Sequence, residues 1–150
     1  MKTLFEDTTV LPFSLPDISA ALSDIGLYFV ETTRNMPDMT SVVLVEQGAG
    51  FVTFKTNQGL VKRTNIAIEH TAARIRVEYA EEYWAGKLIA GISHVMDDFT
   101  IRPAGLAHCT TISGVEAPGF RGFFTRNLDV SRLGEALQAA QRRHIASCTG

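Results

Sequence analysis

The clearest pattern along the chain is an alternation of apolar and charged residues over positions 74–79. Ile75, Val77 and Tyr79 fall on one side of an extended chain, and Arg74, Arg76 and Glu78 fall on the other. Successive side chains of a strand point to opposite faces of its sheet. The alternation therefore predicts a half-buried antiparallel strand with one face against a core and one face in water.

Similar segments on both sides of this strand predict a long run of strands. Residues such as Asn57 and Gly59, which accept positive φ angles, mark the turns between them. The predicted strands cover residues 3–10, 40–46, 51–56, 60–69, 74–79, 87–101 and 106–115. Residues 81–86 are expected to form a loop, and the longest strand is expected to bend near Asp97 and Asp98.

Helical segments are predicted in two places. Residues 16–23 and 24–35 form a pair of short helices after the first strand, ending before Pro37 because proline disfavours helix at the preceding residue. A longer helical region runs from residue 118 to about residue 146. Its apolar stripe consists of Phe123, Val130, Leu133, Leu137 and Ala140. Its expected polar side consists of Glu135, Gln138, Gln141, Arg142 and Arg143.

The order of these elements predicts a single α+β domain over residues 1–150. One strand, two short helices, six consecutive strands and one long helix give two layers, a sheet and a helix packed on one of its faces. A meander of this length twists and curls strongly. The long C-terminal helix would lie in the concavity, and a pocket is expected between helix and sheet.

Three local segments strengthen this interpretation. A proline-containing link, Met36-Pro37-Asp38-Met39, precedes the second strand, the turn Phe99–Gly105 precedes the last strand, and Gly119 precedes the long helix. With the element order, they resemble the START-like or SRPBCC superfamily, whose members include polyketide cyclases and Bet v 1-like proteins. The resemblance implies a helix-grip fold of about seven strands, with the first strand paired to the seventh. It also implies binding of a lipid, polyketide or aromatic molecule.

Composition narrows the class of protein. The chain has 150 residues, 45% of them apolar and 20% charged, with a net charge of −2. These values exclude a disordered chain, and without a basic stripe we expect no nucleic-acid partner. There is no apolar run long enough for an integral membrane segment. The first residues lack the pattern of a signal peptide, so a cytoplasmic location with free thiols at Cys109 and Cys148 is expected.

The candidate ligand-binding residues are aromatic or polar side chains near the expected pocket. Tyr79 lies on the inner face of its strand, three phenylalanines gather at the start of the helical region, and two histidines lie in adjacent long strands. Each of these side chains has plain core packing as an alternative role. The full set is Tyr79, Tyr83, Trp84, His94, Met96, His108, Thr110, Phe120, Phe123 and Phe124. No metal-ligand spacing occurs, and we expect no metal and no cofactor.

Other charged residues are expected to face water. Asp97 and Asp98 are neighbours in a strand and point to opposite faces, so they suit a solvated bend better than a shared catalytic site. Arg63, Arg74 and Arg76 are expected on the outer face of the sheet. There they form either a basic strip or, with nearby glutamates, a mixed solvated surface.

Three functions remain open from the sequence. The first is a binding or carrier protein for an apolar or amphipathic small molecule. The second is a polyketide cyclase or aromatase-like enzyme, in which His94, His108, Tyr79 or Thr110 would steer enolate chemistry; its catalytic residues are unknown. The third is an Aha1-like interaction domain. In the fold that the resemblance implies, residues 40–46 would form an edge strand, and a homodimer through that edge stands beside a monomer as an alternative.

Overall fold

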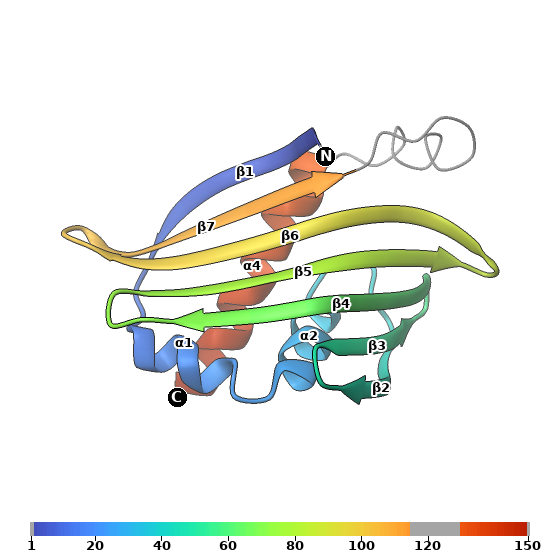
Figure 1. Ribbon diagram of the computed structural model, residues 1–150, viewed down its shortest axis with the longest axis horizontal. Coiled ribbons are helices and arrows are strands. Elements are labelled where there is room, and N and C mark those ends of the chain that lie inside the picture. Colours follow the sequence, from blue (N-terminus) through green and yellow to red (C-terminus); the bar gives the residue numbers. More distant parts are fainter. Residues whose placement is uncertain (1, 115–129, 150) are drawn as a thin grey trace.

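Antiparallel strands build one seven-stranded sheet in the computed structural model, which describes residues 2–114 and 130–149. The spatial order is β1-β7-β6-β5-β4-β3-β2, so the first strand pairs with the last, and β2 lies at the opposite edge of the sheet (Figure 1). Both the seven-stranded sheet and the pairing of β1 with β7 confirm the prediction. The strands are β1 (Lys2–Leu11), β2 (Val42–Gly48), β3 (Phe51–Thr56), β4 (Gly59–His70), β5 (Arg74–Ala85), β6 (Leu88–Arg102) and β7 (Gly105–Gly114).

The helices α1 (Leu15–Ala21), α2 (Ile25–Arg34) and α4 (Val130–Thr149) lie against the sheet. A capping box starts α1, since the Ser14 hydroxyl accepts the Asp17 amide and the Asp17 carboxylate accepts the Ser14 amide. The Asp24 carboxylate accepts the amide of Leu27 at 3.1 Å and starts α2. These caps satisfy amides that lack partners within the helix.

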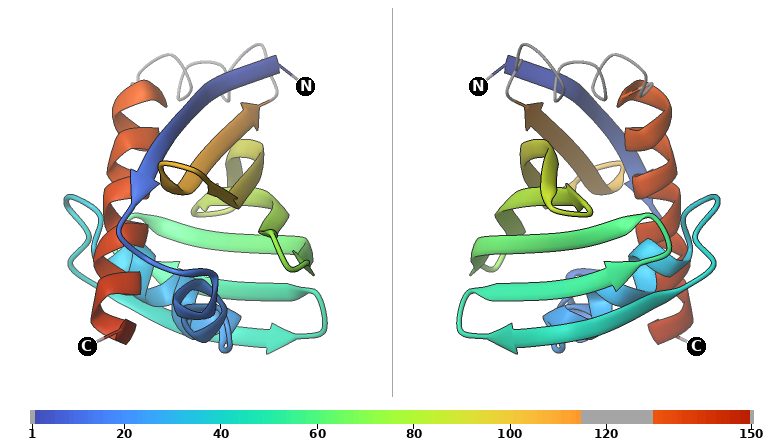
Figure 2. Two further views of the ribbon diagram at one scale, coloured as in Figure 1. Left: turned by 90° about the vertical axis from the view of Figure 1, so that its left-hand side faces the viewer. Right: turned by 90° about the vertical axis from the view of Figure 1, so that its right-hand side faces the viewer.

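Irregular pairing lets the sheet curl. Register shifts interrupt β1 near Phe5, β2 near Leu44, β4 near Asn65 and β5 near Tyr83. Such bulges bend a strand and increase its twist. Asn65 has a positive φ of 53°, consistent with a bulge there. The curled sheet leaves a concave side, and α4 runs across it beside β1 (Figure 2).

The approach of α4 to β1 is close. A Cβ atom placed on Gly134 would lie 2.5 Å from the Phe5 ring, so any side chain there would displace the ring or the helix. Phe5 is itself buried in the core. Gly134 therefore allows the short distance between α4 and β1 on the concave face.

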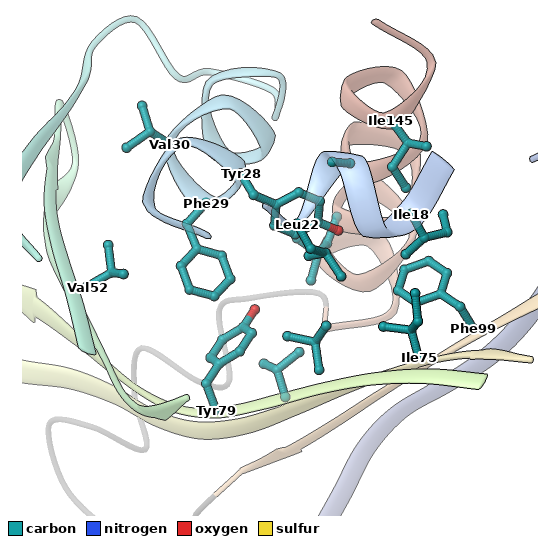
Figure 3. Close-up of a cluster of buried hydrophobic side chains, with 14 of the residues drawn as sticks. Ile18, Leu22, Tyr28, Phe29, Val30, Val52, Ile75, Tyr79, Phe99 and Ile145 are labelled. Atoms are coloured by element: carbon teal, nitrogen blue, oxygen red, sulfur yellow. The ribbon is translucent and has the colours of Figure 1, made fainter. Parts of the chain in front are cut away.

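The core occupies the space between the sheet and the three helices (Figure 3). At one end Phe29 of α2 packs edge-to-face on Tyr79 of β5, with ring centroids 4.9 Å apart. At the other end Ile18, Phe99 and Ile145 pack together, all of them fully buried. The core is packed less tightly at the Phe29 and Tyr79 end, because a cavity adjoins it there.

Two expectations about the strands are wrong. The expected loop at residues 81–86 belongs largely to β5, which continues to Ala85 and pairs with β6. Asp97 and Asp98 do not form a solvated bend, because both pair in continuous register with β5 and β7. Side chains still alternate there, and Asp97 is buried with an exposed fraction of 2%.

The C-terminal helix also departs from its expected polar side. Gln138 and Gln141, predicted on the polar side of the helix, are each 2% exposed. Leu137 and Ala140 are buried as expected. The expected beginning of the helical region, with Phe120, Phe123 and Phe124, lies outside the described residues. Within residues 2–114 and 130–149, no helix is long and apolar enough to cross a membrane.

Candidate ligand-binding cavity

A cavity of about 430 Å³ lies between the concave face of the sheet and the helices α2 and α4. Its walls are mostly apolar. Phe54 and Val61 come from the β3–β4 hairpin, Val95 and Ile112 from β6 and β7, and Leu137 from α4. The curl of the sheet creates this volume, because a helix lying across a concave sheet touches it closely only along part of its length.

Arg63 brings a positive charge to this apolar wall. Its exposed fraction is 6%, and its Nε donates a hydrogen bond to Oε1 of Glu81 at 2.9 Å. Three aromatic rings surround the guanidinium, with Cζ at 4.4 Å from the Phe29 centroid, 4.7 Å from Tyr79 and 5.1 Å from Phe54. Aromatic faces attract a cation, so the rings and Glu81 together hold Arg63 in place.

Arg63 points inward, so the prediction that it lies on the outer face with Arg74 and Arg76 is wrong. Arg63 shares its side of β4 with Val61, which lines the cavity. If the strand alternated without interruption, Arg63 would lie on the face opposite to Ile66 and Ile68. The register shift between Thr64 and Ala67 breaks that alternation. Arg74 and Arg76 do lie outside, where both contact Asp98.

Burial changes the titration of the groups around this ion pair. Burial alone lowers the pKa of Arg63, but interactions with Tyr79 and Glu81 raise it more, so its pKa rises and the guanidinium stays charged. Burial raises the pKa of Tyr79, and the charge of Arg63 opposes this rise in part. The Arg63 guanidinium therefore stays charged near neutral pH, beside an un-ionised Tyr79 phenol.

Most other polar side chains of the wall already have partners. The Thr56 hydroxyl donates to the carbonyl of Gly59 at 3.1 Å. Ser93 donates to Oε2 of Glu81 at 3.5 Å, and the hydroxyl of Tyr83 donates to the carbonyl of Gln58. Thr33 of α2 differs, because its buried hydroxyl has no hydrogen-bond partner among the described residues.

The ten residues predicted from the sequence to bind a ligand occupy several places. Tyr79 and Tyr83 line the cavity. His94 and Met96 lie on the convex face of β6, where His94 Nε2 is 3.3 Å from Glu78 Oε2. Trp84 packs under Lys62 and donates from Nε1 to Glu82 at 3.0 Å, and it does not line the cavity. Phe120, Phe123 and Phe124 fall outside the described residues.

His108 and Thr110 belong to a buried network centred on Asp97. Oδ1 of Asp97 accepts hydrogen bonds from Thr110 at 2.6 Å and pairs with Nε2 of His108 at 2.7 Å. Its Oδ2 accepts from Gln141 Nε2 of α4 at 3.0 Å. Phe99 stacks on the His108 ring with centroids 4.3 Å apart. Burial and the charge of Asp97 raise the pKa of nearby Tyr28.

The network forms the layer next to the cavity. Asp97 lies two residues beyond Val95 on β6, and Thr110 lies two residues before Ile112 on β7. Gln141 lies one helical turn beyond Leu137. Val95, Ile112 and Leu137 line the cavity, whereas none of the network residues does. The network therefore ties α4 to the sheet where the cavity ends.

Sequence reasoning missed Arg63, Glu81, Thr33 and Asp97, although two of them carried a usable signal. Glu81 continues the alternation of Ile75, Val77 and Tyr79, and Asp97 shares the parity of Val95 and Phe99. Their charge suggested solvent exposure, whereas pairing made burial possible. Thr33 carries no comparable signal in the sequence.

The chain is similar to known proteins in its fold and not detectably in its sequence. No family model and no curated protein matches its sequence. Solved structures do match over nearly the whole chain. Protein Ms6760 from Mycobacterium smegmatis aligns over 95% of this chain and 87% of its own, with a TM-score of 0.62 and 12% identity. These values show a shared fold.

Two further matches carry names that bear on function. A STAR-related lipid transfer protein from Xanthomonas axonopodis aligns over 94% of this chain and 84% of its own, with a TM-score of 0.55 and 14% identity. The di-domain ARO/CYC protein BexL, from the BE-7585A biosynthetic pathway, aligns over 94% of this chain and 49% of its own, with a TM-score of 0.53 and 16% identity. The chain thus has the helix-grip fold of START-like and SRPBCC proteins, as its element order predicted.

Proposed function

We propose that the protein binds an apolar or amphipathic small molecule in the cavity between its sheet and α4. The observation that carries the proposal is a cavity of about 430 Å³ with mostly apolar walls and one buried ion pair. Ligand pockets commonly measure about 300–1,000 Å³ and combine apolar walls with a few placed polar groups. The shared fold with a lipid transfer protein and an ARO/CYC protein supports this by analogy.

Gly91 offers a direct way to test the site. It lies on β6 in the cavity wall, and among the described residues a Cβ added there would meet only the Cβ of Tyr83, at 3.9 Å. The substitution Gly91→Phe should therefore place a ring in the cavity without a backbone clash. Met96→Phe is a matched control on the same strand, because Met96 lies on the convex face.

The experiment combines native mass spectrometry of the purified protein with titration of Nile red, an uncharged apolar dye. We expect copurified apolar molecules and saturable dye binding in the wild type and in Met96→Phe, and loss of both in Gly91→Phe. Circular dichroism would verify that the variants fold. Equal dye binding by a folded Gly91→Phe variant, or no binding by the wild type, would contradict the proposal.

A polyketide cyclase-like enzyme is less well supported by the geometry. That hypothesis relied on His94, His108, Thr110 or Tyr79 inside the cavity. His94 lies on the convex face, and His108 and Thr110 are held by Asp97 below the cavity. Only Tyr79 of this set lines it. An interaction domain of the Aha1-like kind is less well supported too, because a mostly apolar cavity suits binding of a small molecule.

The edge strand β2 keeps a homodimer open as a prediction. Val43, Leu44 and Val45 are 59%, 43% and 58% exposed on β2, which is an edge strand of the sheet that the described residues form. Exposed apolar edges favour pairing with another chain, although the register shift at Leu44 twists this one. Gel filtration with light scattering should give a dimer, and a species of 16.4 kDa alone would refute it. A cytoplasmic location also stays a prediction.

A further inference from the structure

Some polar groups of the cavity wall have hydrogen-bond partners within the protein, and others have none among the described residues. Glu81 receives hydrogen bonds from Arg63 and Ser93, and Thr56 and Tyr83 are bonded to backbone groups. Arg63 uses only Nε in this way, which leaves both Nη groups without a hydrogen-bond partner among the described residues. The Thr33 hydroxyl is likewise unpaired, in a residue that is 4% exposed.

These unsatisfied groups lie in one part of the cavity. Thr33 and Phe29 are four residues apart on α2 and therefore share a helix face. The Phe29 ring is 4.4 Å from the guanidinium carbon of Arg63. Thr33 and Arg63 both line the cavity, so the side chains that carry the unpaired hydroxyl and the free guanidinium nitrogens belong to the same wall. Buried polar atoms without partners are rare in folded proteins and call for a physical reason.

Charge decides which ligand group fits there. Among the described residues, Arg63 and Glu81 are the charged residues of the cavity wall, and they neutralise each other. A neutral oxygen can accept from the Nη groups and bond to the Thr33 hydroxyl while the wall stays neutral. A carboxylate would add an uncompensated negative charge beside Glu81, and a buried unpaired charge is strongly unfavourable.

Building on the proposed function, we infer that Arg63 and Thr33 form a polar subsite that selects uncharged ligands with a hydroxyl or carbonyl oxygen over carboxylates of the same length. The ligand class is then an apolar molecule with a neutral oxygen at one end. Its apolar part packs against Phe54, Val61 and Val95, and its oxygen lies at the guanidinium. A fatty acid anion is disfavoured.

Four probes of matched chain length test this selection. Decanol, methyl octyl ketone, decanoate and decane are titrated into the full chain by isothermal calorimetry near neutral pH. Decanol and the ketone should bind at least tenfold more tightly than decanoate and decane. If decane and decanoate bind as tightly as decanol, the inference fails while the proposed function stands. If none of the four binds, the proposed function fails and the inference fails with it.

Two valine substitutions locate the selectivity. Thr33→Val keeps the shape of the side chain and removes the hydroxyl, and it should lower decanol affinity about fivefold without changing decane affinity. Thr32→Val is the matched control, because the Thr32 hydroxyl donates to the Phe29 carbonyl at 3.2 Å and does not line the cavity. Equal effects of the two variants on decanol would contradict the role of Thr33.

Arg63→Met tests the guanidinium. In this variant decanol should lose its advantage over decane, and decanoate should not improve. Tighter decanoate binding in the wild type than in Arg63→Met would show that the guanidinium binds carboxylates and would overturn the inference. If Arg63→Met does not fold, the decanol affinity of Thr33→Val decides whether the inference holds.

Discussion

Two groups of buried polar side chains lie next to each other on the concave face, and they differ in what surrounds them. In the Asp97 network, His108, Thr110 and Gln141 all bond to one carboxylate inside packed protein. In the cavity wall, Arg63 donates a hydrogen bond through Nε alone among the described residues, and three aromatic rings surround its guanidinium. The comparison indicates that burial and charge do not distinguish a structural network from a binding site.

A buried atom without a hydrogen-bond partner indicates a binding site only when its residue also lines the cavity. The network also contains two buried atoms without partners among the described residues, His108 Nδ1 and Gln141 Oε1. Neither residue lines the cavity. The Thr33 hydroxyl is unpaired and does line it. Of these three side chains, Thr33 is therefore the one that a ligand in the cavity would contact.

The largest expected effect is the loss of the shared carboxylate in Asp97→Ala. This change leaves three buried donors without their acceptor and should lower the free energy of unfolding by about 3–5 kcal/mol. Asp98→Ala is the control, since Asp98 lies on the outer face and pairs with half-exposed Arg76. It should cost less than about 1 kcal/mol. Urea denaturation gives both values, and equal costs would remove the structural role of the network.

Replacing the cavity ion pair should behave differently. The double variant Arg63→Met/Glu81→Leu removes both charges, and its free energy of unfolding should stay within about 2 kcal/mol of the wild type or exceed it. The pair borders a cavity, and apolar side chains fit its apolar wall. A loss as large as that of Asp97→Ala would show that the pair serves stability rather than binding.

Adjacent threonines on α2 give a finer test by urea denaturation. Thr33→Val removes an unsatisfied hydroxyl, so the free energy of unfolding should be unchanged or higher by up to about 1 kcal/mol. Thr32→Val removes a bonded hydroxyl and should lower it by about 1 kcal/mol. If Thr33→Val is the more destabilising of the two, its hydroxyl has a protein partner and is not reserved for a ligand.

The smallest effect concerns pH. Burial lowers the pKa of His144 below its usual 6.5, with the charge of Glu31 opposing the shift. The unfolded chain then binds more protons than the folded one below about pH 6.5, so stability should fall as the pH drops. His144→Phe keeps the ring contact with Tyr28. Urea denaturation from about pH 7.5 to 5.5 should give a shallower loss for this variant, and identical slopes would contradict the assignment.

Period and element order were enough to predict the sheet and the helix across its concave face, and the family resemblance added the pairing of β1 with β7. They failed where local geometry or pairing decides the direction of a side chain. The bulge after Thr64 reversed the inferred face of Arg63. Asp97 and Gln141 are polar residues that become buried because they bond to each other across β6 and α4. Such pairing is long-range and leaves no period in the sequence.

The location of a bound ligand's oxygen tests the central claim most directly. In the complex with decanol, intermolecular nuclear Overhauser effects should connect the hydroxyl-bearing methylene to the Thr33 methyl and to the Tyr79 ring. The terminal methyl of decanol should instead contact Val95 or Ile112. Contacts from the terminal methyl to Thr33, or contacts confined to the convex face around His94 and Met96, would contradict a neutral-oxygen subsite in this cavity.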